Sequence, residues 1–256
     1  RTKDNLEEYP GAKHGQGELY YPKVRVVAAH ALSSGVAGDL AIGSYTDSEL
    51  ALGKEVLGRL PAGSLIVADR YYQSPKFLEA AAAAGHKVLV RLKDAVGRKL
   101  IGELKETIGE RQVTWEAKQK DKSTVRLEGK VVKYTSEVAG FRSQTFYFFT
   151  TAELELEAVA DLYRQRVRVE VFIRQIKQTL KLFFIRSKSP ENIRKEIYIA
   201  YLTFNLMRGI MEFAGVKKDL DTVRISFTAT IELCKAYSKA LLLAKTKAER
   251  QKLIDD

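Results

Sequence analysis

A strand, a helix and a second strand follow one another between residues 64 and 92, and this order constrains the fold more than any other feature. The run Ser64–Ala68 is short, unbroken and apolar, which is typical of a strand buried on both faces. A helix is predicted from about Ser74 through the alanines at 80–84, before the strand Lys87–Leu92. Strands joined in this way predict an α/β fold. Ligands of open α/β sheets bind beyond the carboxyl ends of the strands, where Asp69 stands.

The flanking segments extend this pattern. Residues 1–22 are polar and rich in glycine and proline, which predicts loop, and a helix is predicted at Asp47–Leu60. Two further strands are predicted at Val24–Ala29 and Gly38–Tyr45. We therefore assign residues 1–93 to the first part of an α/β core.

The sequence pattern changes at residues 94–150, where apolar and polar residues alternate and turn residues recur. An antiparallel β insertion is predicted there, with strands at Gln112–Ala117, Val125–Tyr134 and Thr145–Thr150. From residue 151 the pattern is helical. We assign residues 151–215 to the second part of the core, including a helix from Pro190 to about Ala214, and residues 216–256 to a C-terminal helical region.

The charge of the chain favours a polyanionic partner. The 256 residues carry a formal net charge of +11, and nucleic acid is the usual partner of so basic a protein. A basic domain that binds no nucleic acid is the alternative. Because no apolar run is long enough to cross a bilayer and no signal region follows the N-terminus, we expect a soluble, intracellular protein.

One predicted helix, Tyr163–Lys177, places a carboxylate among cations. At about 100° per residue, Tyr163, Arg166, Glu170 and Lys177 fall within an arc of roughly 60°. The simplest interpretation is an amphipathic surface helix with a Glu–Arg ion pair. Phosphoryl transfer on DNA also needs such a set, because carboxylates hold Mg²⁺ and cations hold phosphates. Asp69 would add a second carboxylate, or it would only cap the following turn.

The spacing Tyr163-x2-Arg166-x3-Glu170-x6-Lys177 resembles the Tyr-Arg-Glu-Lys signature of a large group of bacterial insertion-sequence transposases in the DDE transposase and integrase superfamily. The resemblance covers roughly residues 1–214 and departs from the pattern at Val167, where an Arg-Trp pair is common. Further similar stretches are Tyr21-Pro22-Lys23-Val24-Arg25, Val67-Ala68-Asp69-Arg70 and Arg186-Ser187-Lys188.

The resemblance implies an RNase H-like fold with a β insertion, and metal-dependent cleavage and transfer of DNA strands at transposon ends. Asp69 and Glu170 would bind the catalytic metal, which is two Mg²⁺ or Mn²⁺ ions in the intact enzyme. The expected partners are double-stranded DNA, as terminal inverted repeats and target, and a second copy of the chain in the synaptic complex. The expected location is the bacterial cytoplasm, on the nucleoid.

Residues expected to contact DNA fall into two groups. The resemblance implies phosphate contacts by Tyr163, Arg166 and Lys177, with Arg70 and Arg174 as further candidates. Trp115 is a candidate for stacking on a displaced base, although a lone Trp on a strand is more often a core anchor.

The family also requires a first Asp on the first strand of the sheet. Asp4 is the only aspartate before Asp39, and no strand-like run precedes it. We therefore expect the chain to begin just after that strand, to keep two of three metal ligands, and not to cut DNA by itself. The alternatives are a non-catalytic DNA-binding remnant or regulator of transposition, a metal-dependent nuclease of the same fold, and a basic α/β protein unrelated to DNA.

Overall fold

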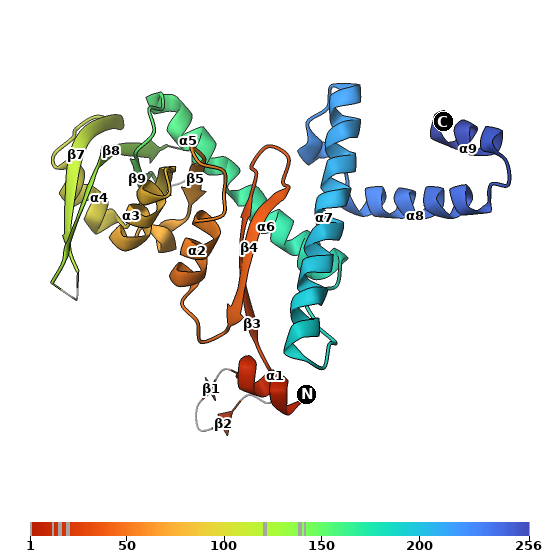
Figure 1. Ribbon diagram of the computed structural model, residues 1–256. Helices are drawn as coiled ribbons and strands as arrows, with labels where there is room; N and C mark the ends of the chain where they lie inside the picture. The colour runs from red at the N-terminus through yellow and green to blue at the C-terminus, as the bar shows by residue number, and fades with distance from the viewer. Residues whose placement is uncertain are drawn as a thin grey trace. The chain divides into compact units, whose positions relative to one another are not determined.

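The computed structural model (Figure 1) describes residues 2–11, 13–14, 17–18, 21–119, 122–137, 140 and 142–255. The chain forms two compact units. The first holds residues 3–29 and 38–168, and the second holds residues 30–37 and 169 onward together with Thr2. The mixed α/β class expected from the sequence is confirmed.

A five-stranded mixed sheet forms the centre of the first unit (Figure 1). Its order is β5-β6-β9-β8-β7, with β5 parallel to β6 and the other pairs antiparallel. Because β9 pairs with β6, the strands predicted as an insertion continue the sheet instead of forming a separate one. The bounds are β5 Leu65–Ala68, β6 Lys87–Arg91, β7 Ile108–Lys118, β8 Thr124–Ser136 and β9 Gln144–Thr150.

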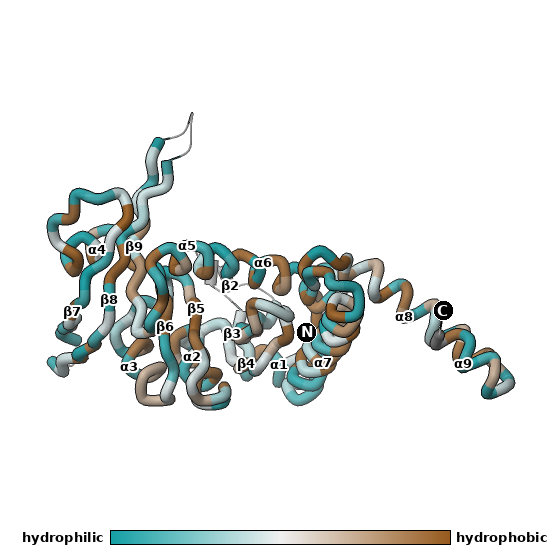
Figure 2. The backbone as a smooth tube through the Cα atoms, turned by 90° about the horizontal axis from the view of Figure 1, so that it is seen from above, coloured by the Kyte–Doolittle hydropathy of each residue, from teal (hydrophilic) through white to brown (hydrophobic). Residues whose placement is uncertain are grey.

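Helices cover both faces of this sheet. Val88 and Val90 of β6 pack in the larger core, under α3 (Pro75–Ala83) and α4 (Asp94–Ile101). Leu89, between them, points to the other face and packs with residues of α5 (Leu156–Gln165), as the period of two along a strand requires. The apolar residues of both layers can be followed in brown in Figure 2.

Helix α4 corrects the prediction of β-like structure from residue 94. It spans only eight residues and contains Gly97, which lowers helix propensity. The glycine is needed for packing, because a Cβ at Gly97 would lie 2.3 Å from the Cβ of Tyr147 on β9. Tertiary packing therefore stabilises a helix that local propensity does not indicate.

The two strands predicted near the N-terminus pair with each other in a second, two-stranded sheet. They are β3 (Val24–His30) and β4 (Ala37–Ser44). Among the described strands, β3 pairs only with β4 and β5 only with β6, so each has one unpaired edge. β5 packs on both faces as predicted, with Ile66 and Ala68 against the larger core and Leu65 and Val67 against the other, but all four of its residues are only half-buried.

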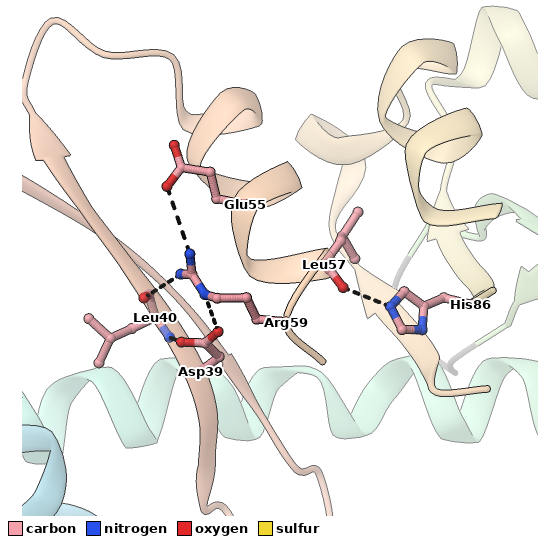
Figure 3. A network of polar contacts seen from close by, with 6 residues as sticks. All are labelled: Asp39, Leu40, Glu55, Leu57, Arg59 and His86. Atoms are coloured by element: carbon pink, nitrogen blue, oxygen red, sulfur yellow. Dashed lines mark hydrogen bonds and ion pairs between the residues drawn. The ribbon is translucent and has the colours of Figure 1, made fainter. Parts of the chain in front are cut away.

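Helix α2 (Glu49–Leu57) is shorter than predicted and is held at its C-terminal end by polar contacts (Figure 3). Arg59 donates from Nε to the Asp39 carboxylate and from Nη2 to the carbonyl of Leu40, 2.8 Å away on β4. The buried His86 ring nitrogen Nε2 lies 2.9 Å from the carbonyl oxygen of Leu57. These contacts tie α2 to β4 and to the residue before β6.

The N-terminal residues are more ordered than the predicted loop. Helix α1 spans Lys3–Glu8, and Tyr9 after it is buried. The short strands β1 (Lys13–His14) and β2 (Gly17–Glu18) pair antiparallel. Residues 1, 12, 15, 16, 19 and 20 of the predicted loop lie outside the described residues.

The second unit is mostly helical and also contains the turn at residues 30–37, which joins β3 to β4. Arg208 is buried, donates from Nε to the carbonyl of Ser34 at 2.6 Å, and stacks over the ring of Phe172. Gly35 adopts a φ of +79°, and a Cβ there would lie 2.7 Å from Arg208 Nε, so glycine fits both the backbone and the space. Asn205 bonds both the amide and the carbonyl of Ala37.

The helices of this unit are α6 (Val167–Arg174, shared with the first unit), the π-helical η2 (Gln175–Thr179), α7 (Pro190–Lys218), the short η3 (Thr222–Arg224), α8 (Phe227–Leu243) and α9 (Lys247–Asp255). The long helix α7 passes the predicted end near Gly215 and stops at Asp219, which has a φ of +52°. Within the described part of the chain, no helix combines the length and apolarity needed to span a bilayer.

Candidate functional site

Asp69 lies where β5 ends and the short helix η1 (Arg70–Tyr72) begins. Its Oδ1 accepts a hydrogen bond of 2.7 Å from the amide of Tyr71, so the capping role is present. No hydrogen bond within the described residues engages Oδ2. The carboxylate is half-buried and keeps one oxygen for a cation. Capping and metal binding are therefore compatible at this residue.

Tyr163 lies on α5, within electrostatic reach of Asp69 and of two arginines. Its ring packs on Phe148 with centroids 4.8 Å apart, and the Arg166 guanidinium lies 5.9 Å from its centroid. Burial raises the pKa of the Tyr163 phenol, the charges of Arg166 and Arg91 oppose that rise, and the charge of Asp69 adds to it. The first unit thus brings Asp69, Tyr163 and Arg166 together.

Arg91 was not among the residues singled out from the sequence. It is the last residue of β6, which runs parallel to β5, so Arg91 and Asp69 emerge at the same edge of the sheet. Its guanidinium lies 4.7 Å from the centroid of Phe146. The rule that ligands bind at the carboxyl ends of parallel strands could have identified it.

Trp115 corrects a prediction. The indole on β7 is 8% exposed and packs edge-on against Phe149 at 5.5 Å within the larger core. A side chain so buried has no face to offer to a base. The core-anchor interpretation is therefore the one that the structure supports, and we withdraw the assignment as a DNA contact.

The predicted helix Tyr163–Lys177 is not one regular α-helix. α5 ends at Gln165, α6 begins at Val167, and the chain is π-helical from Gln175 to Thr179. A π-helix has more residues per turn than an α-helix, so Lys177 leaves the register that the predicted arc assumed. π-helical turns occur frequently at functional sites.

Exposed charged side chains follow this break. Glu170 and Arg174 on α6 and Lys177 in η2 are exposed, and so is Arg70 on η1. Phe172 and Ile176 are buried, as expected for the apolar face of this helix, whereas Ile173, predicted on the same face, is 39% exposed. Glu170 lies on the part of α6 that belongs to the second unit, whereas Asp69 belongs to the first.

The oxygen atoms of carboxylate side chains suit a hard cation. Among the described residues, no three His, Cys, Asp or Glu side chains form a group that could hold a metal ion. Asp69 and Glu170 each have carboxylate oxygens, and Mg²⁺ and Mn²⁺ prefer oxygen ligands. Softer metals prefer sulfur and imidazole ligands instead.

Comparison with known proteins gives a consistent result. The family model for the transposase DDE domain matches residues 1–206. The chain is 28% identical over 224 residues to "Transposase InsG for insertion sequence element IS4" of Escherichia coli (strain K12). That alignment covers 81% of this chain and 48% of the relative, so the chain spans about half the length of the relative.

Proposed function

Because the chain belongs to the transposase DDE domain family, we propose that it takes part in metal-dependent cleavage and transfer of DNA strands at the ends of an insertion sequence. The observation that carries the proposal is that Asp69 and Arg91, at the carboxyl ends of two parallel strands, both act electrostatically on Tyr163, whose ring centroid lies 5.9 Å from the Arg166 guanidinium. Such a grouping joins a carboxylate that can hold a cation to groups that can hold a phosphate.

Asp69 and Glu170 are the proposed metal ligands. The divalent ions, when bound, would activate the attacking hydroxyl and stabilise the leaving oxygen of an in-line displacement. Asp69 contributes through Oδ2, since Oδ1 is fixed by the amide of Tyr71. The exposed carboxylate of Glu170 can reach an ion without any loss of core packing.

The cations and the phenol are proposed to position the DNA. Arg166 would bind a phosphate through its guanidinium, and Lys177 would add a point charge after the break in the helix. The Tyr163 hydroxyl is protonated at neutral pH, a state that burial favours further by raising its pKa, so it can donate a hydrogen bond to a phosphate oxygen. Arg70 and Arg174 are exposed and would extend this surface.

We propose that the third carboxylate of the site comes from outside these 256 residues. Asp4, the only aspartate before Asp39, lies on helix α1 and not on a strand. β3 and β5 each have an edge without a partner among the described strands, and the residues of both are half-buried. A strand that pairs with these edges would complete the sheet and place a carboxylate beside Asp69.

A cleavage assay tests this arrangement. The 256-residue chain, freed of contaminating nuclease, should leave terminal-repeat DNA intact in Mg²⁺ or Mn²⁺. Cleavage by this chain alone would overturn the proposal of an external third ligand. An intact reading frame that encodes no Asp on a strand upstream would favour a DNA-binding remnant or regulator instead. Cleavage without strand transfer by the full-length product would favour a nuclease.

We also propose that two copies associate through one face of α7. Five apolar residues on this helix are 58–77% exposed and recur at intervals of three, four and seven residues: Ile199, Leu202, Leu206, Phe213 and Val216. The opposite face, which includes Ile197, Phe204 and Met211, is buried. A helix that is apolar on two faces needs a partner for the second one.

The shape of this exposed row suits a second copy of the chain. Its five side chains would supply part of the roughly 800 Å² that each partner contributes to a standard interface, and neighbouring residues on the same face would supply the rest. Gly209 lies within the row, and a Cβ there would meet nothing within 4 Å. No neighbouring atom of this chain therefore explains a glycine at position 209. A glycine at this position would let a helix of a second copy approach α7 closely.

A further inference from the structure

A pair of exposed phenylalanines follows the π-helical turn that carries Lys177. Phe183 is 66% exposed and Phe184 is 75% exposed. Their ring centroids are 4.8 Å apart and the rings are nearly perpendicular. Two adjacent aromatic side chains in solvent are costly unless something covers them, so this pair marks a binding surface.

The backbone holds the pair in place beside Lys177. The amide of Phe183 donates to the carbonyl of Lys177 at 3.1 Å, and the amide of Leu182 donates to that of Ile176 at 3.3 Å. Lys181 adopts a φ of +60°, a conformation that few residues other than glycine take up. At the far end of the loop, Glu196 accepts hydrogen bonds from the amides of Arg186 and Ser187. The exposed rings therefore lie in a constrained loop.

The charge around the pair identifies the kind of partner. Residues 171–190 contain five basic residues and no acidic one. All five are exposed: Arg174, Lys177, Lys181, Arg186 and Lys188. Aromatic side chains set among cations are the arrangement by which proteins bind single-stranded nucleic acid, because the rings stack on bases and the cations follow the phosphates. An apolar protein partner would not need this concentration of positive charge.

We propose that Phe183 and Phe184 form a stacking surface for an unpaired DNA base, with the surrounding basic residues holding the adjacent phosphates. The perpendicular rings present one aromatic face and one edge, which suits a base stacked on the first ring and bordered by the second. The proposal rests on the proposed function, since strand cleavage and transfer expose unpaired bases at a DNA end. It adds a binding site outside the Tyr-Arg-Glu-Lys residues.

The test compares two DNA probes and two sets of variants of the 256-residue chain. Affinities for a 20-nucleotide single strand and for a blunt 20-base-pair duplex are measured at one salt concentration. We expect the double variant Phe183→Ala/Phe184→Ala to lose between about 5- and 150-fold in affinity for the single strand, as for one stacked base. Its affinity for the duplex should stay within about twofold of the wild type. The variant Phe183→Tyr/Phe184→Tyr, which keeps the rings, should bind both probes as the wild type does.

The control is Tyr198→Ala, which removes an exposed ring on α7 outside this loop and should change neither affinity. Unchanged single-strand binding by the double alanine variant would overturn the stacking surface while leaving the proposed function standing. An equal loss on both probes would also overturn it, because a stacking role is specific to unpaired bases. Failure of the wild type to bind either probe would instead contradict the proposed function as well.

Discussion

At the scale of single residues, the sequence predicted which side chains form the site, and the role of each stays a prediction. The spacing of Tyr163, Arg166, Glu170 and Lys177 pointed to a transposase, and the family is confirmed. Arg91 was not predicted, because its position beside Asp69 depends on the pairing of β5 with β6, which no local sequence pattern specifies. The sequence could not decide between a core role and a stacking role for Trp115 for the same reason, since the neighbouring strands determine whether its side chain is buried.

Arg166 and Lys177 should each contribute one phosphate contact. Replacing either with Gln is expected to weaken duplex binding and to lower the slope of log affinity against log salt by about one, because one fewer counterion is released. Fluorescence anisotropy titrations from 50 to 200 mM salt measure both quantities. Lys235→Gln is the matched control, since Lys235 on α8 pairs with Glu232 at 2.8 Å. Unchanged slopes for both site variants would favour a basic protein unrelated to DNA.

His30 should make stability depend on pH. Burial lowers its pKa below 6.5, the hydrogen bond to the carbonyl of Gly35 opposes the shift, and the charge of Arg208 adds to it. Between the lowered pKa and 6.5 the unfolded chain binds a proton that the folded chain does not. The free energy of unfolding therefore rises with pH in that window, by at most about 1.4 kcal/mol per pH unit, and is constant with respect to this group above it.

Urea unfolding at pH 5.5, 6.5 and 7.5 tests this slope. The variant His30→Asn keeps a donor for the carbonyl of Gly35 but does not titrate in this range. Its stability should fall less than that of the wild type between pH 6.5 and 5.5. Parallel pH dependence of the two proteins would show that His30 is not the group responsible.

At the scale of elements, the sequence predicted the strands and helices that have strong local patterns. β5, α3 and β6 lie where the apolar run, the alanine run and the second apolar run predicted them. α1 and α4 were missed because both are short, and the interior glycine of α4 is explained only by its contact with Tyr147. The break at Arg166 and the π-helical turn at Gln175–Thr179 were also invisible, since periodicity assumes a regular helix.

The sheet extension formed by β7, β8 and β9 depends on Trp115 for its packing. Replacing Trp115 with Ala should lower the free energy of unfolding by about 3–5 kcal/mol, because it removes a large side chain from a core that cannot fully collapse. Trp115→Phe should cost less. Chemical denaturation measures both. Under conditions where Trp115→Ala is folded, its affinity for single-stranded DNA should match that of the wild type, and a specific loss of that affinity would restore the stacking assignment that we have withdrawn.

At the scale of the whole molecule, the division into two units was not predicted. The boundary falls between Arg168 and Val169, inside a helical segment that the sequence presents as continuous. The turn at residues 30–37 belongs to the second unit through Arg208 and Asn205, which are more than 160 positions away in the chain. Such long-range contacts depend on shape and hydrogen bonding that no local sequence pattern specifies.

Association of two copies through α7 is expected to be sensitive to charge. Leu206→Glu would place a carboxylate in the middle of the proposed interface and should convert a dimer to a monomer. Sedimentation velocity measures the change. The control is Leu242→Glu on α8, a leucine outside the row that is more exposed than Leu206 (83% against 58%), and this change should leave the dimer intact. A wild-type chain that remains monomeric at high micromolar concentration would contradict the proposed interface.

The central claim is that Asp69 and Glu170 hold the metal for DNA strand cleavage. The most direct test uses the product of the full reading frame that contains these residues, on DNA carrying the ends of its insertion sequence, in Mg²⁺. Asn at position 69 keeps an oxygen for the amide of Tyr71, so Asp69→Asn should fold normally. We predict that Asp69→Asn and Glu170→Gln each reduce the cleavage rate at least about 100-fold, while Glu153→Gln does not. Cleavage at the wild-type rate by either site variant would contradict the claim.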